Sequence, residues 1–200
     1  MKKFLFAAVL SLAAASARAE VAPGQPAPDF TLGDQAGKSH KLSDSKGKYV
    51  VLEWWNKDCP FVRRQYKAKN MQGLQKKYAA EGVVWFTIDS SAKGNEGYLA
   101  PQAAAYIMKK QGMGSTAVLL DPKGDVGRLY GAKTTPHMFI VDPKGTLIYM
   151  GAIDDKPSTD TDPKDFDGVH NYVSAAIDAA MSGKPVPNPV TKSYGCGVKY

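Results

Sequence analysis

Apolar and polar residues alternate along this 200-residue chain in blocks that predict strands and helices in turn. Three short runs, residues 49–55, 83–89 and 118–121, are rich in β-branched and aromatic side chains and are apolar on both faces. This pattern is typical of strands in the middle of a sheet that is covered on both sides. Two further apolar runs, 138–141 and 146–150, flank Asp-Pro-Lys-Gly and predict a β-hairpin.

Apolar residues at helical spacing lie between these strands. One long helix is predicted from Pro60 to near Gly82, on the spacing of Val62, Tyr66, Leu74 and Tyr78. Helices are also predicted over about 100–111 and 169–181, with a short helical turn at 126–130. The order of elements predicts one α/β domain with a central mixed sheet flanked by helices.

The two ends of the chain depart from this pattern. Residues 1–19 combine Lys2 and Lys3, an apolar run and small residues before Glu20, which predicts a cleaved signal peptide and a periplasmic or secreted protein. A membrane anchor is disfavoured because the run is shorter than the roughly 20 residues that span a bilayer. We assign residues 20–182 to the domain, and residues 183–200 to a Pro-rich linker and a flexible tail with Cys196.

Composition and charge exclude several classes of protein. With 44% hydrophobic and 22% charged residues, the chain is not a disordered, collagen-like or coiled-coil sequence. The 26 basic and 19 acidic residues give a net charge of +7, of which Lys2, Lys3 and Arg18 belong to the leader. The remaining +4 gives no indication of a nucleic-acid partner, and no further stretch is apolar enough to span a membrane.

Cys59 is the first candidate for chemistry. It lies between the end of a predicted central strand and Pro60, so the positive end of the helix dipole points at its sulfur. Lys57, Arg63 and Arg64 provide positive charge nearby, and Asp58 opposes it. This setting favours a nucleophilic thiolate over an inert buried thiol.

The residues around Cys59 carry a resemblance to a known family. The segment YVVLEWWNKDCPFV at 49–62 resembles the active-site segment of the thioredoxin superfamily, and Thr134-Thr135-Pro136 resembles its proline loop. Together with the ending GCGVKY, residues 26–182 most resemble exported, peroxiredoxin-like redoxins of the AhpC/TSA type. The resemblance implies a thioredoxin-like fold, attack by Cys59 on a peroxide or disulfide, proton relay by Glu53, and a cis Pro136 beside the sulfur.

Two departures from the family pattern bear on the reaction. Val62 stands where a dithiol oxidoreductase has its second cysteine. Leu52 and Asn56 stand where a typical peroxiredoxin has Pro and Thr, so the hydroxyl that would orient a peroxide is missing. Asn56 retains hydrogen-bonding groups, and peroxide reduction is weakened rather than excluded.

Cys196 and Glu53 each leave two interpretations open. Cys196 is either the thiol that recycles an oxidised Cys59 or one half of a permanent disulfide in an oxidising compartment. Glu53 is either a proton shuttle, with its pKa raised by burial in an apolar strand, or an acid that reaches solvent or a lysine.

Three functions follow, in order of preference. The first is a thiol peroxidase, an antioxidant enzyme in which Cys59 attacks a hydroperoxide, Arg63 or Arg64 assists electrostatically, and Cys196 or an external thiol reductant resolves the product. The second is thiol–disulfide exchange on protein partners, and the third is a thiol or copper-binding module. No cofactor or metal site is predicted, because the three histidines, His40, His137 and His170, are scattered and the acidic run at 154–167 lacks calcium-loop spacing. The acidic run is expected to be a solvated loop with a helix-capping Asp. His137 is expected to lie either near Cys59 or on the other face of the sheet.

Overall fold

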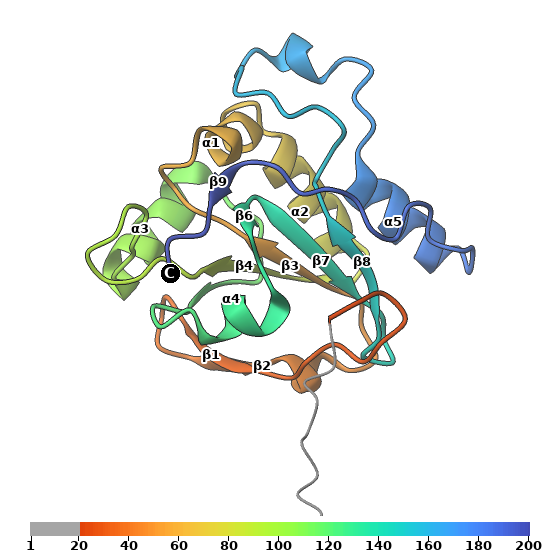
Figure 1. Ribbon diagram of the computed structural model, residues 1–200, viewed down its shortest axis with the longest axis horizontal. Helices are drawn as coiled ribbons and strands as arrows, with labels where there is room; N and C mark the ends of the chain where they lie inside the picture. Colours follow the sequence, from red (N-terminus) through yellow and green to blue (C-terminus); the bar gives the residue numbers. More distant parts are fainter. Residues whose placement is uncertain (1–20) are drawn as a thin grey trace, which may run out of the picture.

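The computed structural model describes residues 21–200, so the expected leader at 1–19 lies outside the described residues (Figure 1). A central sheet has seven strands in the order β2-β1-β5-β4-β3-β7-β8. The strands are β1 (Thr31–Asp34), β2 (Ser39–Lys41), β3 (Val50–Trp54), β4 (Val84–Asp89), β5 (Ala117–Leu120), β7 (His137–Val141) and β8 (Leu147–Gly151). A separate short pair joins β6 (Thr134–Thr135) to β9 (Cys196–Gly197).

The central strands are buried on both faces, as their apolar runs predict. β3 pairs in parallel with β4, and β4 in parallel with β5. Antiparallel pairs add β7 and β8 at one edge of the sheet and β1 and β2 at the other. Every residue of β3 is buried, with Val51 in the core cluster on one face and Leu52 and Trp54 in the cluster on the other. The predicted α/β fold with a mixed, thioredoxin-like sheet is confirmed.

Helices cover both faces of this sheet (Figure 1). The core cluster on one face includes residues of α1 (Pro60–Lys67), α2 (Asn70–Ala80), α3 (Pro101–Gln111) and α5 (Tyr172–Met181). The cluster on the other face includes α4 (Asp125–Tyr130) and the 3-10 turn η1 (Leu42–Ser45), and a second 3-10 turn, η2, spans Pro163–Phe166. Trp54, Trp55 and Trp85 are core residues with at most 1% of their surface exposed.

The predicted long helix at 60–82 is wrong, because the chain breaks it into α1 and α2. Lys69 takes a left-handed conformation, with φ of 63°, directly before α2. In a straight helix at about 100° per residue, Met71 and Tyr78 would lie about 140° and 120° around the axis from Tyr66. The break lets α2 turn Met71 and Tyr78 toward the sheet, where both are fully buried with Tyr66.

The C-terminal segment is not the flexible tail that its composition predicts. Thr191 donates a backbone hydrogen bond of 3.1 Å to Met150 of β8, and Lys199 accepts one of 2.8 Å from Ala92. The hydroxyl of Tyr200 donates to the carbonyl of Ala132 at 2.7 Å. Proline and glycine prevent regular structure in this segment. Hydrogen bonds to backbone groups of neighbouring elements nevertheless hold the segment against the domain.

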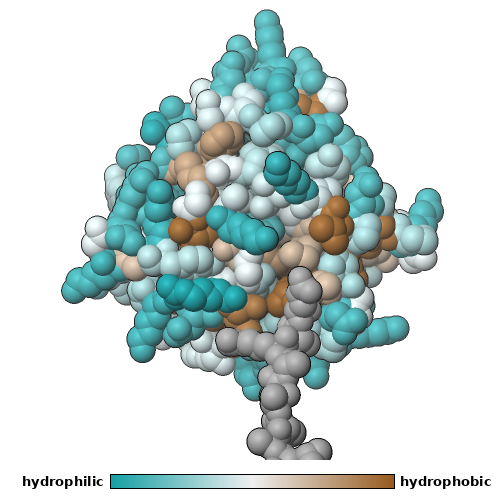
Figure 2. All heavy atoms as spheres, viewed as in Figure 1, coloured by the Kyte–Doolittle hydropathy of each residue, from teal (hydrophilic) through white to brown (hydrophobic). Residues whose placement is uncertain are grey.

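The visible face of the molecule is mostly hydrophilic, with small, separate apolar areas (Figure 2). Among residues 21–200, no helix has the length and apolar character needed to cross a membrane.

Candidate active site

Cys59 occupies the position directly before the first turn of α1. Pro60 is the first helical residue, and the amide of Arg63 donates to the carbonyl of Cys59 at 2.9 Å. The free thiol of Cys59 is almost fully buried, with 1% of its surface exposed. The end of β3 and the start of α1 therefore place the sulfur at the positive end of a helix dipole.

Asn56 shapes the turn that leads to Cys59. Its side-chain oxygen accepts from the amide of Asp58 at 2.8 Å, and its side-chain nitrogen donates to the carbonyl of Glu96 at 3.1 Å. A Cβ on Gly97 would overlap the Asn56 amide, so a glycine is required where this loop passes. Both ends of the Asn56 amide are thus occupied by backbone groups.

The proline loop faces the sulfur from the other side. The Thr135–Pro136 peptide bond is cis, and the thiol of Cys59 donates a hydrogen bond of 3.0 Å to the carbonyl oxygen of Thr135. The structure therefore brings Cys59 and the loop that contains Pro136 together.

Cys196, in the C-terminal segment, also lies beside the proline loop. In the antiparallel β6–β9 pair, Cys196 lies opposite Thr135. Burial raises the pKa of the Cys196 thiol to about 12, and Cys59 contributes as hydrogen-bond partner and neighbouring charge. The two cysteines, both free, therefore adjoin one another although 137 positions separate them in the sequence.

Glycine and tyrosine residues hold the C-terminal segment against the loop. Gly195 has a φ of 124°, and a Cβ at this position would overlap the carbonyl oxygen of Thr135. Next to it, the ring of Tyr194 lies 5.8 Å from that of Phe61, and its hydroxyl donates to Asp154. The absence of a side chain at Gly195 is what lets the backbone approach closely enough for β9 to form.

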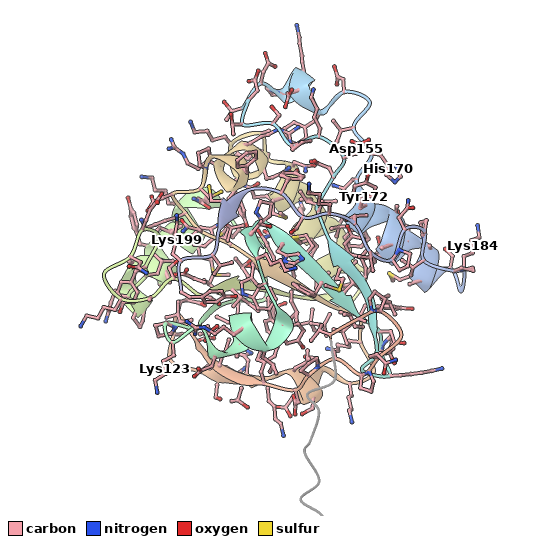
Figure 3. The ribbon with its side chains drawn as sticks, in the orientation of Figure 1. Lys123, Asp155, His170, Tyr172, Lys184 and Lys199 are labelled. Atoms are coloured by element: carbon pink, nitrogen blue, oxygen red, sulfur yellow. The ribbon has the colours of Figure 1, made fainter. Side chains whose placement is uncertain are left out.

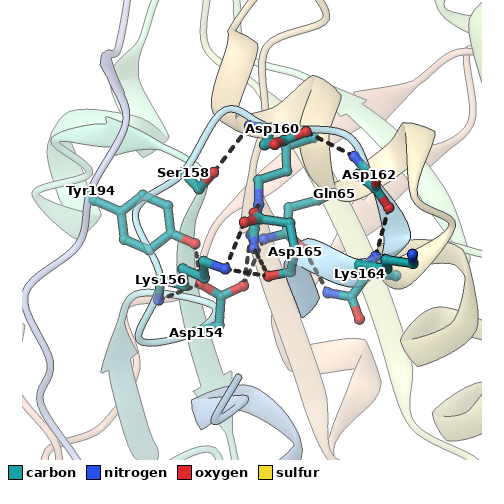
Figure 4. Close-up of polar contacts among 11 residues, drawn as sticks. Gln65, Asp154, Lys156, Ser158, Asp160, Asp162, Lys164, Asp165 and Tyr194 are labelled. Atoms are coloured by element: carbon teal, nitrogen blue, oxygen red, sulfur yellow. Dashed lines mark hydrogen bonds and ion pairs between the residues drawn. The ribbon is translucent and has the colours of Figure 1, made fainter. Parts of the chain in front are cut away.

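Arg64 belongs to a buried polar cluster. Figure 4 shows other members of this cluster, among them Gln65, Asp154 and Asp165. The guanidinium of Arg64 pairs with Asp154 at 3.2 Å and with Asp165 at 2.7 Å, and it lies 3.9 Å from the ring centre of Phe166. Asp154 also accepts from Gln65 at 2.8 Å. Of the two arginines expected to assist Cys59, Arg64 therefore has its charge paired with these carboxylates.

The same cluster corrects the prediction for the acidic run. Asp154 is buried with 1% of its surface exposed, so this end of the run is not solvated. Asp162 does cap a turn, since its carboxylate accepts from the amide of Lys164 at the start of η2.

Arg63 lies on the exposed surface of α1, about 100° around the helix axis from Arg64. It is exposed, and it lines a surface hollow together with Lys57 and Lys67. Within the described part of the chain, no carboxylate lies within 4.0 Å of it.

Glu53 is fully buried within β3 and is held by four donors. They are Tyr66 at 2.8 Å, Trp85 at 2.8 Å, Gln75 at 3.1 Å and Thr87 at 3.2 Å. Burial raises the pKa of Glu53 to about 6, and these hydrogen bonds oppose the rise. Among residues 21–200, neither cysteine is a hydrogen-bond partner of Glu53.

His137 lies on the other face of the sheet from Cys59. Its ring packs 4.5 Å from that of Phe139, within the cluster that includes Trp54. Burial lowers the pKa of His137 to about 4, and the charge of Lys133 adds to this effect.

Sequence reasoning missed the partners of Glu53 and the buried cluster around Arg64, because they come from elements far apart in the chain.

A cysteine at a helix start, a cis-proline loop beside it and a mixed sheet behind it define a thioredoxin-like thiol oxidoreductase. The model of the AhpC/TSA family matches residues 23–150, and the chain belongs to that family. The resemblance expected from the sequence is thereby confirmed.

Curated relatives and solved structures agree with this assignment. The chain is 33% identical over 135 residues to the thioredoxin-like protein YneN of Bacillus subtilis strain 168, covering 66% of this chain and 74% of YneN. It is 29% identical over 135 residues to the thiol-disulfide oxidoreductase ResA of the same organism, covering 64% of this chain and 66% of ResA.

A solved structure extends the similarity toward the C-terminus. The crystal structure of a conserved protein from Geobacillus kaustophilus superposes with a TM-score of 0.79 at 26% identity, covering 91% of this chain and 94% of that one. A match that stopped at residue 150 would cover at most 75% of the chain, so this one reaches into the segment beyond the family model.

Proposed function

We propose that this protein is a thiol–disulfide oxidoreductase that acts on protein disulfides and uses Cys59 and Cys196 as its redox pair. The observation that carries the proposal is the meeting of the two free thiols at Thr135. The similarity to ResA supports exchange of thiols and disulfides as the chemistry. In this proposal Cys196 supplies the second thiol, because Val62 stands where a dithiol oxidoreductase has its second cysteine.

The proposed reaction has two exchange steps. The Cys59 thiolate attacks one sulfur of a substrate disulfide, which forms a mixed disulfide and releases the other substrate sulfur as a thiolate that takes up a proton. Cys196 then loses its proton and attacks the Cys59 sulfur, which releases the second substrate thiol. The products are a reduced substrate and a Cys59–Cys196 disulfide, which an external dithiol returns to the reduced state.

The positions of the two thiols support an order of attack. Cys59 lies at the positive end of the α1 dipole, whereas Cys196 lies in β9, away from any helix start, and burial and the neighbouring Cys59 raise its pKa, so we assign the first attack to Cys59. Attack by Cys196 then requires a base, and we assign proton transfer to Glu53 through an intervening group, because Glu53 does not bond to either thiol directly. We further propose that Pro136 positions the loop against the sulfur and that Arg63 adds positive charge near Cys59.

Peroxide is the less supported substrate, although the sequence favours it as the first choice. A peroxidase of this kind needs a polar group free to orient the peroxide beside the sulfur, and the Asn56 amide is occupied at both ends by backbone partners. We also propose that the protein acts after export, on the evidence of its predicted leader at 1–19 alone.

The test compares two substrates and two variants. Wild-type protein is expected to reduce insulin disulfides with dithiothreitol as electron source, and Cys59→Ser is expected to be inactive. Cys196→Ser is expected to accumulate a mixed disulfide with the substrate, visible by mass spectrometry of acid-quenched samples. Consumption of hydrogen peroxide without insulin reduction would instead establish the peroxidase, and a Cys196→Ser variant with unchanged turnover would remove Cys196 from the mechanism.

A further inference from the structure

Basic residues surround a hollow beside α1. The hollow has a volume of about 350 Å³, and five of its eight lining residues are basic: Lys57, Arg63, Lys67, Lys69 and Lys110. Arg63 and Lys67 also line a second hollow of about 310 Å³, together with Pro60, Thr159 and Thr161. We call the first of these the basic hollow.

The positive charge of the basic hollow is nearly uncompensated. In the described chain, only Lys57 among the five has a carboxylate within 4.0 Å, that of Asp58. Residues 1–20 contain three basic residues and one acid, so residues 21–200 contain 23 basic and 18 acidic residues and carry +5. The five basic residues and Asp58 together carry +4, which is most of that excess. A concentration of one charge in a concave surface attracts ligands of the opposite charge.

Two glutamines line the basic hollow together with its cations. Gln72 donates its amide nitrogen to the backbone carbonyls of Tyr66 and Gln111, at 2.9 and 2.8 Å. The side-chain oxygens of Gln72 and Gln111 are both buried, and neither has a hydrogen-bond partner within residues 21–200. Because these oxygens are closed off from the surface, the five basic side chains are the charged groups that face a ligand, and a peptide with several carboxylates can pair with more of them than a single small anion can.

The basic hollow adjoins the reactive thiol. Lys57 lies two residues before Cys59, and Arg63 lies one helical turn after it, with its amide bonded to the Cys59 carbonyl. A peptide held in the hollow therefore has its neighbouring residues beside the helix start from which Cys59 attacks.

We propose that the basic hollow is the docking site for an acidic peptide segment of the protein whose disulfide exchanges with Cys59. The proposal rests on the proposed function and names the class of partner that this site takes. Attraction between the acidic segment and the lysines speeds the encounter and holds the partner's sulfur near Cys59.

The test uses two synthetic peptides that differ only in charge. Each contains one cysteine activated as a pyridyl disulfide, flanked in one peptide by glutamates and in the other by glutamines. Attack by Cys59 forms the protein–peptide disulfide and releases thiopyridone, whose absorbance gives the rate. At low salt the Glu peptide is expected to react at least about tenfold faster than the Gln peptide, and this advantage is expected to shrink in high salt.

Two triple variants with equal charge change locate the effect. The first neutralises the hollow as Lys67→Gln, Lys69→Gln and Lys110→Gln. The control neutralises three exposed lysines elsewhere as Lys123→Gln, Lys144→Gln and Lys184→Gln, and Figure 3 shows two of these, Lys123 and Lys184, at ends of the molecule remote from α1. The hollow variant is expected to lose the preference for the Glu peptide and keep its rate with the Gln peptide, while the control keeps both.

Each contrary result has a distinct meaning. Equal rates for the Glu and Gln peptides, or the same loss in both triple variants, would overturn acidic docking and leave the proposed function standing. Absence of reaction with either peptide would overturn the proposed function itself. A preference for oxidised glutathione over the Glu peptide, lost in the hollow variant, would reject the peptide and assign the hollow to a small anionic disulfide.

Discussion

Cys59 and Cys196 both contact the backbone of Thr135. The Cys59 thiol donates to the Thr135 carbonyl at 3.0 Å, and Cys196 in β9 is the strand partner of Thr135 in β6. The proline loop therefore positions the reactive sulfur and also receives the strand that contains the second thiol. In the proposed mechanism this arrangement makes the C-terminal segment part of the active site, although the family model ends at residue 150.

A cysteine placed at Val62 is expected to take over the role of Cys196. Val62 is buried, one helical turn after Cys59, at the position where a dithiol enzyme has its second cysteine. In the Cys196→Ser background, Val62→Cys is expected to release the mixed disulfide that the single variant accumulates, because a thiol is again within reach of the Cys59 sulfur. The measurement is the lifetime of the mixed disulfide after quenching. A matched Val62→Ala change in the same background should leave it trapped, and equal lifetimes in both double variants would contradict the role of Cys196.

The close approach at Gly195 predicts that a single methyl group will release the C-terminal segment. Gly195→Ala places a Cβ against the Thr135 carbonyl at a φ that disfavours side chains. Alkylation of the buried Cys59 by iodoacetamide, followed by peptide mapping, is expected to accelerate at least about tenfold, which corresponds to about 1.4 kcal/mol of lost docking energy. Gly197→Ala is the control, because a Cβ there meets nothing within 4 Å. An unchanged alkylation rate in Gly195→Ala would show that β9 does not protect Cys59.

The buried charge of Arg64 predicts a large loss of stability on its removal. Arg64 and Asp154 have no exposed side-chain surface, so Arg64→Met leaves the Asp154 carboxylate buried without its cation. The free energy of unfolding in urea is expected to fall by about 3–5 kcal/mol. The control is Lys77→Met in the exposed pair with Asp178, at 3.0 Å, where a change below about 1 kcal/mol is expected. A cost at Arg64 as small as that at Lys77 would contradict the structural role of the cluster.

The sequence predicts the parts of the site that a local pattern specifies. The apolar run of β3 followed by Cys59 and Pro60 is sufficient to place a thiol at a helix start, and the central strands follow from their composition. The break at Lys69 leaves no such pattern, because a left-handed residue other than glycine or asparagine has no compositional signal. The docking of β9 is invisible for the same reason, since it depends on two backbone pairs and on one glycine that passes close to Thr135.

Tertiary contacts also determine the hydrogen bonds of the buried Glu53 carboxylate. The strand pattern places Glu53 among apolar residues, but its four donors come from α1, α2 and β4, which meet only in the folded protein. These donors explain how a carboxylate persists in the core, because a buried acceptor with several hydrogen bonds avoids most of the cost of desolvation.

Glu53 predicts a specific pH dependence of stability. Burial raises its pKa from the ordinary 4.5 to about 6, so the folded protein binds the proton more tightly than the unfolded chain does. Between these two values the unfolded state binds fewer protons, and the contribution of Glu53 to the free energy of unfolding falls as the pH rises, by about 2 kcal/mol in total. Asp89, whose pKa burial also raises to about 6, acts in the same direction, whereas the lowered pKa of His137 acts in the opposite one.

The test of Glu53 is therefore the difference between Glu53→Gln and the parent, measured by urea unfolding at several pH values from 4 to 7.5. Because the amide does not titrate, the variant is expected to gain stability relative to the parent as the pH rises, by about 2 kcal/mol across this range. The offset at low pH reports the cost of turning an amide toward donors such as Trp85 and is separate from the slope. Asp89→Asn serves as a control that should show a similar slope without changing the rate at which Cys196 resolves the mixed disulfide. A flat difference for Glu53→Gln would mean that its carboxyl titrates normally. An unchanged rate at which Cys196 resolves the mixed disulfide in Glu53→Gln would remove the proton-transfer role.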